Sequence, residues 1–158
     1  MLRISKLTDY GIVVLDQLAQ VGAVKLSADD VAQRTGLAMP TVRKVMKSLV
    51  DAGLVLAQRG AKGGYRLAKA PHQVRVLDVV EAFEGPVSLT ECSTETHRCD
   101  ITAHCSLSSS WGGINQLLMK VLARVTLDDV RTPALQDQLY RDLVPLSSRI
   151  QLLNIDDE

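Results

Sequence analysis

The residues best suited to chemistry are three cysteines, Cys92, Cys99 and Cys105, which fall within fourteen residues of one another. They are the only cysteines in the 158-residue chain, and the residues between them are mostly polar. Such a loop has little apolar material to bury, so packing alone is not expected to order it. Three thiolates that converge on a metal would supply folding free energy directly, and an odd number of cysteines argues against a disulfide framework. We therefore predict a three-cysteine metal or iron–sulfur site.

Other chemistry is open to the same thiols. Six and then five residues separate the cysteines, unlike the CxxC pairs of zinc ribbons, and from spacing alone a structural zinc ion and a cluster are equally favoured. Free thiols that react with oxidants are a further alternative. Because three thiolates leave a fourth coordination position, His97 and His104 within the loop are candidate ligands.

The first half of the chain carries the pattern of a helix-turn-helix. Apolar residues at helical spacing predict a helix over 6–21, and Ser27 is a favourable N-cap for a short helix over 28–34. A third helix has Pro40 in its first turn and runs to about residue 52. Two short helices joined by a glycine-containing turn predict a helix-turn-helix, with an ordinary helical hairpin as the alternative.

A predicted hairpin follows directly, because residues 54–68 alternate apolar and polar side chains around a glycine-rich turn. A hairpin after a helix-turn-helix is a wing, which favours DNA binding over a simple hairpin of helices. Cations at the wing tip could contact phosphate or enter a minor groove. The candidate DNA-binding residues are Pro40, Thr41, Arg43, Lys44 and Lys47 of the third helix, and Arg59, Lys62, Gly63 and Tyr65 of the hairpin.

The charge distribution agrees with this interpretation although the formal net charge is zero. Residues 1–70 carry 11 lysines and arginines against 5 acidic residues, whereas residues 71–158 carry 7 against 13. A basic half is the electrostatic signature of a nucleic-acid-binding module. The sequence shows no nucleophile–base arrangement, phosphate-binding loop or CxxC redox pair, so an enzyme is not expected.

The second half is predicted to begin with a helix over 74–85, followed by the cysteine loop. A longer helix over 111–125 carries a broad apolar stripe, made of Trp111, Ile114, Leu117, Leu118, Val121, Leu122 and Val125. Little chain remains to cover this stripe, and helix-turn-helix proteins commonly bind as two-fold dimers, so we expect a partner subunit to cover it. Packing within one protomer is the alternative.

The expected fold class is therefore mainly α, with a winged helix-turn-helix, a small β-hairpin wing, a cysteine loop and a long dimerisation helix. The expected divisions are a DNA-binding domain (1–70), a connecting helix with the cysteine loop (71–108), a dimerisation helix (109–130) and a tail of unknown role (131–158). Charged residues interrupt the first twenty positions, and no apolar run approaches the roughly 18 residues of a membrane span. We expect a cytoplasmic protein without a membrane partner or a small-molecule substrate.

With the wing and the cysteine loop placed, the chain resembles the Rrf2 family of iron–sulfur-dependent winged-helix regulators. This family includes regulators of the Isc and Suf cluster-assembly operons and the nitric-oxide-sensing repressor. The matching stretches are LRISKLTDYG, RTGLAMPTVRKVMKSLVDAGLV, RGAKGGYRLA and VLDVVEAFEGPVSLTEC, with the three cysteines ahead of the helix that holds Trp111. They cover about residues 1–130, and SKLTDYG and RGAKGGY are most similar to the Suf-system branch.

The resemblance implies a homodimeric repressor of cluster-assembly genes that binds a [2Fe-2S] or [4Fe-4S] cluster and an operator. The family's cluster cysteines fall on Cys92, Cys99 and Cys105, and its wing arginine falls on Arg59. Some members use a histidine three residues after the third cysteine, where this chain has Ser108. Others use an aspartate of the partner protomer, and that position matches Asp9. Asp9 is therefore the leading fourth ligand. His104 and His97 are weaker alternatives, and a water or a small thiol could also fill the position.

Overall fold

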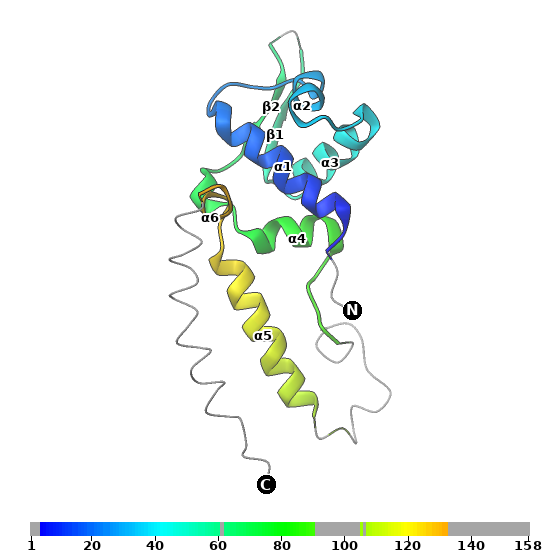
Figure 1. Ribbon diagram of the computed structural model, residues 1–158, viewed down its shortest axis with the longest axis vertical. Helices are drawn as coiled ribbons and strands as arrows, with labels where there is room; N and C mark the ends of the chain where they lie inside the picture. The colour runs from blue at the N-terminus through cyan, green and yellow to red at the C-terminus, as the bar shows by residue number, and fades with distance from the viewer. Residues whose placement is uncertain (1–3, 61, 91–104, 106, 133–158) are drawn as a thin grey trace.

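The computed structural model of the protein describes residues 4–60, 62–90, 105 and 107–132. Several helices and a hairpin gather at one end of the molecule, from which a further helix leads away toward the other end (Figure 1). In chain order the elements are α1 (Lys6–Val21), α2 (Ala28–Thr35), α3 (Met39–Asp51), β1 (Val55–Gln58), β2 (Gly64–Leu67), the 3-10 helix η1 (Pro71–Gln73), α4 (Val76–Glu84), α5 (Ser108–Arg124) and α6 (Leu127–Arg131). This is the mainly helical winged-helix fold that the sequence predicted.

Local sequence signals explain where the helices of the helix-turn-helix begin and end. Ser27 caps α2 by accepting a hydrogen bond from the backbone N–H of Asp30, whose carboxylate accepts one from the Ser27 N–H in return. Gly36 ends α2 with a φ of 70°, in the left-handed region that favours glycine. The chain then turns sharply into α3, which has Pro40 in its first turn. The predicted helix-turn-helix is confirmed.

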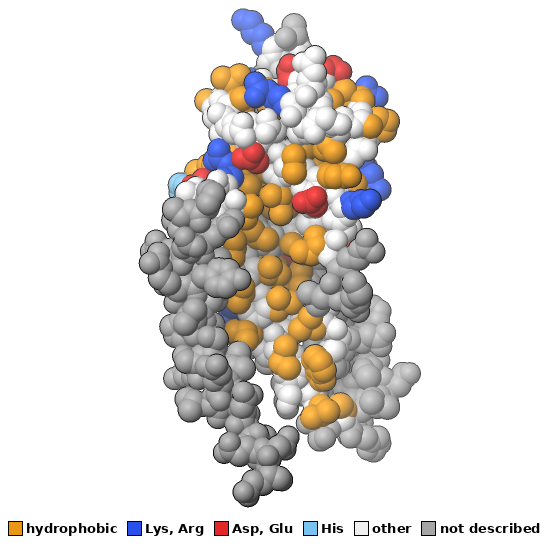
Figure 2. Space-filling model, viewed as in Figure 1, with side chains coloured by type: hydrophobic (Ala, Val, Ile, Leu, Met, Phe, Trp, Pro, Cys, Tyr) orange, Lys and Arg blue, Asp and Glu red, His pale blue; other side chains and the backbone are white. Residues whose placement is uncertain are grey.

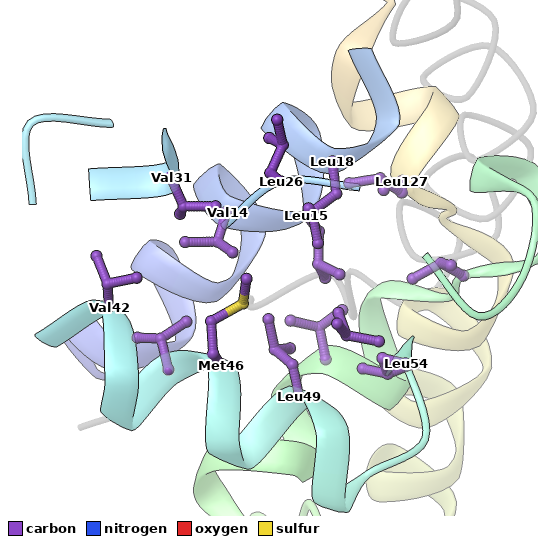
Figure 3. Packing of buried hydrophobic residues seen from close by; sticks show 14 residues of the cluster. Val14, Leu15, Leu18, Leu26, Val31, Val42, Met46, Leu49, Leu54 and Leu127 are labelled. Atoms are coloured by element: carbon purple, nitrogen blue, oxygen red, sulfur yellow. The ribbon is translucent and has the colours of Figure 1, made fainter. Parts of the chain in front are cut away.

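One hydrophobic core joins α1, α2 and α3 and holds the helix-turn-helix rigid (Figure 3). Its labelled members are Val14, Leu15 and Leu18 from α1, Val31 from α2, and Val42, Met46 and Leu49 from α3, with Leu26, Leu54 and Leu127. Full burial of one such aliphatic side chain contributes about 1.5–3 kcal/mol. The apolar faces of α1 and α3 therefore meet in this core, and the opposite face of α3 points outward.

The hairpin is antiparallel and is braced by the segment before α2. Val55 pairs with Leu67 and Gln58 pairs with Gly64. Leu26 adds a single bridge to β2, because its N–H donates to the Tyr65 carbonyl at 3.0 Å and its carbonyl accepts from the Tyr65 N–H at 2.8 Å. These bonds fix the wing relative to the helix-turn-helix.

Two backbone hydrogen bonds join the beginning of the second half to a later part of the same half. The Val76 N–H donates to the Val125 carbonyl, and the Leu127 N–H donates to the Val74 carbonyl, both at 2.8 Å. The start of α4 is therefore tied to the end of α5. Beyond this tie α6 packs beside η1 and α1, and α5 extends away from the winged module (Figure 1).

Three details differ from the sequence-based expectations. The connection at Pro71 forms η1, because proline is favoured at the first position of a short helix. The long helix begins at Ser108, three residues earlier than expected. A separate helix, α6, follows it because Thr126 and Asp129 form a capping box that starts a new helix.

Candidate nucleic-acid interface and cysteine site

The outward face of α3 carries the cations that the sequence assigned to DNA binding. Val42 and Val45 are fully buried on the inner face. Arg43, Lys44 and Lys47 are exposed on the outer face, as is Pro40, whereas Thr41 is half-buried at the start of the helix. The helical period separates the two sets, since residues three and four apart share a face.

A groove lies between α3 and the wing and brings cations of both elements together. Its volume is about 330 Å³, and it is lined by Arg43, Met46, Lys47, Val50, Asp51, Ala57, Gln58, Arg59, Gly64 and Tyr65. The predicted site residues Arg43, Lys47, Arg59 and Tyr65 therefore come from distant parts of the chain to one surface. Such a positive groove suits a phosphate backbone, and the half-buried Tyr65 contributes an aromatic wall.

The wing tip is a tight turn in which backbone groups lie close together. The Gly63 N–H donates to the Gly60 carbonyl at 2.8 Å, and Gly60 has a φ of 101°. A Cβ atom on Gly63 would lie 2.7 Å from the Gly60 carbonyl oxygen and 3.0 Å from the Arg59 carbonyl carbon. A side chain at position 63 would therefore collide with the backbone, so the turn needs glycine there. The compact turn lets Arg59 and Lys62 project from its tip.

A lysine outside the hairpin braces this tip. Lys25 Nζ donates to Gln58 Oε1 at 2.5 Å and lies 3.5 Å from the Lys62 carbonyl oxygen. The Lys25 cation thus lies beside the wing and adds positive charge next to its tip. Lys25 could not be recognised from the sequence, because no local pattern reveals a contact across 33 residues.

The described chain contains only part of the predicted cysteine site. Cys105 is half-buried and precedes α5 by three residues, whereas Cys92, Cys99, His97 and His104 lie outside the described residues. Among the described residues no three metal-binding side chains lie together. The candidate ligand Asp9 lies in the first turn of α1 and is exposed, and its carboxylate has no hydrogen-bond partner within the described ranges.

The first part of the apolar stripe on α5 is exposed in the protomer, whereas its later members are half-buried: Leu118, Val121, Leu122 and Val125. Trp111 is 40% exposed, Ile114 49% and Leu117 42%, and Leu107 just before the helix is 58% exposed. Figure 2 shows hydrophobic side chains gathered along the part of the molecule that α5 forms. Large apolar residues at helical spacing on one exposed face indicate a protein interaction surface.

One acidic residue near the cysteine loop was missed by the sequence analysis. The Glu84 carboxylate, at the end of α4, accepts hydrogen bonds from the Ser5 N–H at 3.0 Å and from the Thr8 hydroxyl. Hydrogen bonds from Ser5 and Thr8 hold the pKa of Glu84 below its ordinary value, because they favour the charged carboxylate. No sequence signal joins residues 76 or more positions apart, so only the fold reveals this contact.

A helix-turn-helix followed by a hairpin, with cations on both facing surfaces, defines a winged-helix DNA-binding protein. Comparison with known proteins shows the family within this class. The chain belongs to the Rrf2 family, whose sequence model, described as an iron-dependent transcriptional regulator, matches residues 4–133. The Rrf2 protein of Nitratidesulfovibrio vulgaris is 32% identical over 126 residues, which cover 79% of this chain and 84% of that protein.

Solved structures of transcriptional regulators share the fold. The global cysteine regulator CymR of B. subtilis is 28% identical and covers 82% of this chain, with 96% of its own chain matched and a TM-score of 0.64. IscR of T. potens is 29% identical and covers 84% of this chain, with 88% of its own chain matched and a TM-score of 0.60. These relatives are regulators rather than enzymes, which confirms the expectation from the sequence. No described helix is both long and apolar enough to span a membrane.

Proposed function

We propose that the groove between α3 and the wing is the operator-binding surface of this regulator. The observation that carries this proposal is the convergence of Arg43 and Lys47 from α3 with Arg59 from the wing around one groove. In this arrangement the outer face of α3 enters a major groove, and the wing tip reaches the adjacent phosphates or minor groove. Lys44, Thr41 and Pro40 extend the same surface toward the start of α3.

The operator-binding unit that we propose is a homodimer joined through α5. The exposed Trp111, Ile114 and Leu117 are large apolar side chains on a helix that leads away from the winged module (Figure 1). Pairing of two such stripes would remove them from water and would leave both winged modules free. The two-fold axis of a dimer also matches an operator made of two half-sites.

The signal that we propose is an iron–sulfur cluster held by Cys92, Cys99 and Cys105. Three thiolates suit iron, and the half-buried Cys105 lies three residues before α5, the proposed dimerisation helix. The proposed fourth ligand is Asp9 of the partner protomer, because its carboxylate is exposed and lacks a partner among the described residues. When bound, the cluster supplies a redox-responsive group whose presence or state biases the dimer. Iron–sulfur assembly genes are the proposed targets, with repression as the proposed effect.

Anaerobic purification of the full chain tests this proposal directly. Brown protein with sulfide-to-iron charge-transfer bands and a different operator affinity after cluster removal is the expected result. Asp9→Ala is expected to change the visible spectrum or the stability of the cluster. Asp29→Ala removes a comparable exposed carboxylate, from the first turn of α2, and serves as the matched control.

Each contrary result removes a defined part of the proposal. Colourless protein with stoichiometric zinc would replace the cluster with a structural zinc site. Colourless, metal-free protein whose operator affinity changes with thiol oxidation would favour direct thiol sensing. Equal operator affinities with and without the cluster, at matched salt, would refute cluster control while leaving DNA binding intact.

A further inference from the structure

The start of α1 is capped by a residue from another helix. Ser5 is its N-cap, and its hydroxyl accepts from the Thr8 N–H at 3.4 Å. In α2 the reciprocal bond of the capping box comes from Asp30, within the same turn. In α1 the reciprocal acceptor is instead Glu84 of α4. Its carboxylate accepts a hydrogen bond from the Ser5 N–H at 3.0 Å and another from the buried Thr8 hydroxyl. The cap of α1 is therefore completed by a residue of another helix, α4.

The same junction contains a close apolar contact. A Cβ atom on Gly11 would lie 2.8 Å from Phe83 Cζ, so the ring of Phe83 occupies the space that a side chain on α1 would need. Phe83 is the residue before Glu84 on α4. The last turn of α4 is therefore held against the first two turns of α1 by both a charged cap and a packed ring.

A second polar contact holds α1 further along. Arg131 Nε lies 2.7 Å from Asp16 Oδ1, in an ion pair whose side chains are only 26% and 31% exposed. The other carboxylate oxygen of Asp16 accepts from Gln20 Nε2 at 2.7 Å, which fixes the orientation of the carboxylate. Arg131 ends α6, which follows the dimerisation helix. The side chains of α1 thus meet Glu84 near its start and Arg131 two to three turns later.

These two contacts lie at the two ends of residues 85–130, which we call the sensing segment. Glu84 is the last residue of α4, before the segment that leads into the cysteine loop, and Arg131 is the last residue of α6, the helix that follows α5. All the chain between them, which includes the three cysteines and the exposed apolar stripe, therefore begins and ends at α1. In addition, the hydrogen bond from the Val76 N–H to the Val125 carbonyl joins the start of α4 directly to the end of α5.

On its other side α1 packs directly on the recognition helix. Val14 and Leu15 of α1 are fully buried in one cluster with Val42 and Met46 of α3 (Figure 3). Packed interiors deform little, so a shift of α1 must move α3 or create a void. A direct physical connection therefore runs from both ends of the sensing segment, through α1, to the DNA-binding surface.

We propose that α1 relays the state of the sensing segment to α3, and that Glu84 and Arg131 are the positioning residues of this relay. The proposal rests on the proposed cluster control, which supplies the two states to be relayed. Neither residue lines the groove between α3 and the wing, so neither is expected to contact DNA. Their loss should change the coupling between cluster and operator without removing operator binding itself.

The test measures operator affinity of the full-length dimer with and without its cluster, at matched salt. The ratio of the two dissociation constants is the coupling factor. Glu84→Ala and Arg131→Ala are each expected to move this factor toward one by about threefold or more, with cluster-free affinity changed by less than about twofold. Arg75→Gln is the matched control, because Arg75, the N-cap residue of α4, forms its ion pair with Asp78 in the first turn of the same helix, at 2.5 Å, and not with a residue of α1.

Rescue separates positioning from general destabilisation. Arg131 Nη1 also lies 3.5 Å from Asp128 Oδ1, so the charge reversal must remove that carboxylate as well. The triple variant Asp16→Arg, Arg131→Asp and Asp128→Asn reverses the ion pair without repulsion from Asp128, and it is expected to restore much of the coupling that Arg131→Ala loses. If Glu84→Ala does not fold, Glu84→Gln retains an acceptor oxygen for the Ser5 N–H and should lower the coupling less. In each variant the visible spectrum reports cluster content independently of DNA binding.

The outcomes distinguish the relay from the cluster proposal. A wild-type coupling factor near one, in brown protein, overturns cluster control and the relay together. A wild-type factor well above one that stays unchanged in folded Glu84→Ala and Arg131→Ala proteins overturns the relay alone. Lowered factors in both variants, an unchanged factor in Arg75→Gln and rescue by charge reversal support it.

Discussion

Replacement of Gly63 by alanine tests whether the geometry of the wing tip matters for operator binding. The added methyl group would press on the backbone carbonyls of Gln58 and Gly60, and backbone atoms in a tight turn cannot move aside as a flexible side chain can. The turn must therefore open, which breaks the 2.8 Å hydrogen bond from Gly63 to Gly60 and displaces Arg59.

The size of the effect follows from the two interactions that are lost. A backbone hydrogen bond contributes about 0.5–1.5 kcal/mol to stability, so the fold itself should survive the substitution. Loss of one arginine contact with DNA costs about 1–3 kcal/mol, which corresponds to roughly a 5- to 150-fold weaker complex. We therefore expect operator affinity to fall by about fivefold or more, while the free energy of unfolding falls by only about 1 kcal/mol.

Fluorescence anisotropy of a labelled operator, measured at several salt concentrations, provides the assay. Arg59→Ala should weaken binding to a similar extent and, if Arg59 contacts phosphate, should lower the salt slope by about one. Gly113→Ala is the matched control, because the added methyl group on exposed Gly113 meets nothing within 4 Å. Unchanged operator affinity in folded Gly63→Ala protein would refute the assignment of the wing tip to DNA.

Three further predictions concern assembly, pH dependence and the core. Ile114→Glu places a charge in the exposed α5 stripe and should convert the dimer into monomers in sedimentation analysis, with intact circular dichroism; a dimer that persists would move the interface elsewhere. The pKa of Glu84 is lowered by hydrogen bonds from Ser5, so its charged form stabilises the folded state above the ordinary glutamate pKa. The stability advantage of wild type over Glu84→Gln should thus be constant near pH 7 and shrink as the pH falls below about 4, and a pH-independent difference would contradict this. Leu15→Ala removes a fully buried side chain and should lower the free energy of unfolding by about 3–5 kcal/mol in urea titrations, whereas a loss below about 1 kcal/mol would show that the core refills.

The helices and the hairpin could be predicted because their signals are local. Ser27 and Gly36 mark the ends of α2, and the period of apolar residues separates the inner and outer faces of α3. The glycine-rich turn likewise predicts the wing. Because each signal acts over a few residues, the order of elements followed without knowledge of the fold. Of the elements that the structure describes, η1 and α6 were not predicted, because their short lengths carry weak periodicity.

The joint surface of α3 and the wing could be predicted only in part. The charges of Arg43 and Arg59 are evident in the sequence, but their position on one groove depends on the Leu26–Tyr65 bridge that sets the angle of the hairpin. The support from Lys25 was not predictable, since it joins Gln58 across the two elements.

By itself, the sequence determined the chemistry that this protein has available: three cysteines, a basic first half, and apolar stripes at helical spacing. Only the tertiary structure decided how these parts are connected. The Glu84 cap and the Arg131–Asp16 ion pair join residues 76 to 115 positions apart. Contacts over such distances form only after the core has packed, and they leave no periodic or compositional trace in the chain. For that reason the sequence identifies the sensor and the DNA-binding elements, whereas the fold identifies α1 as the helix between them.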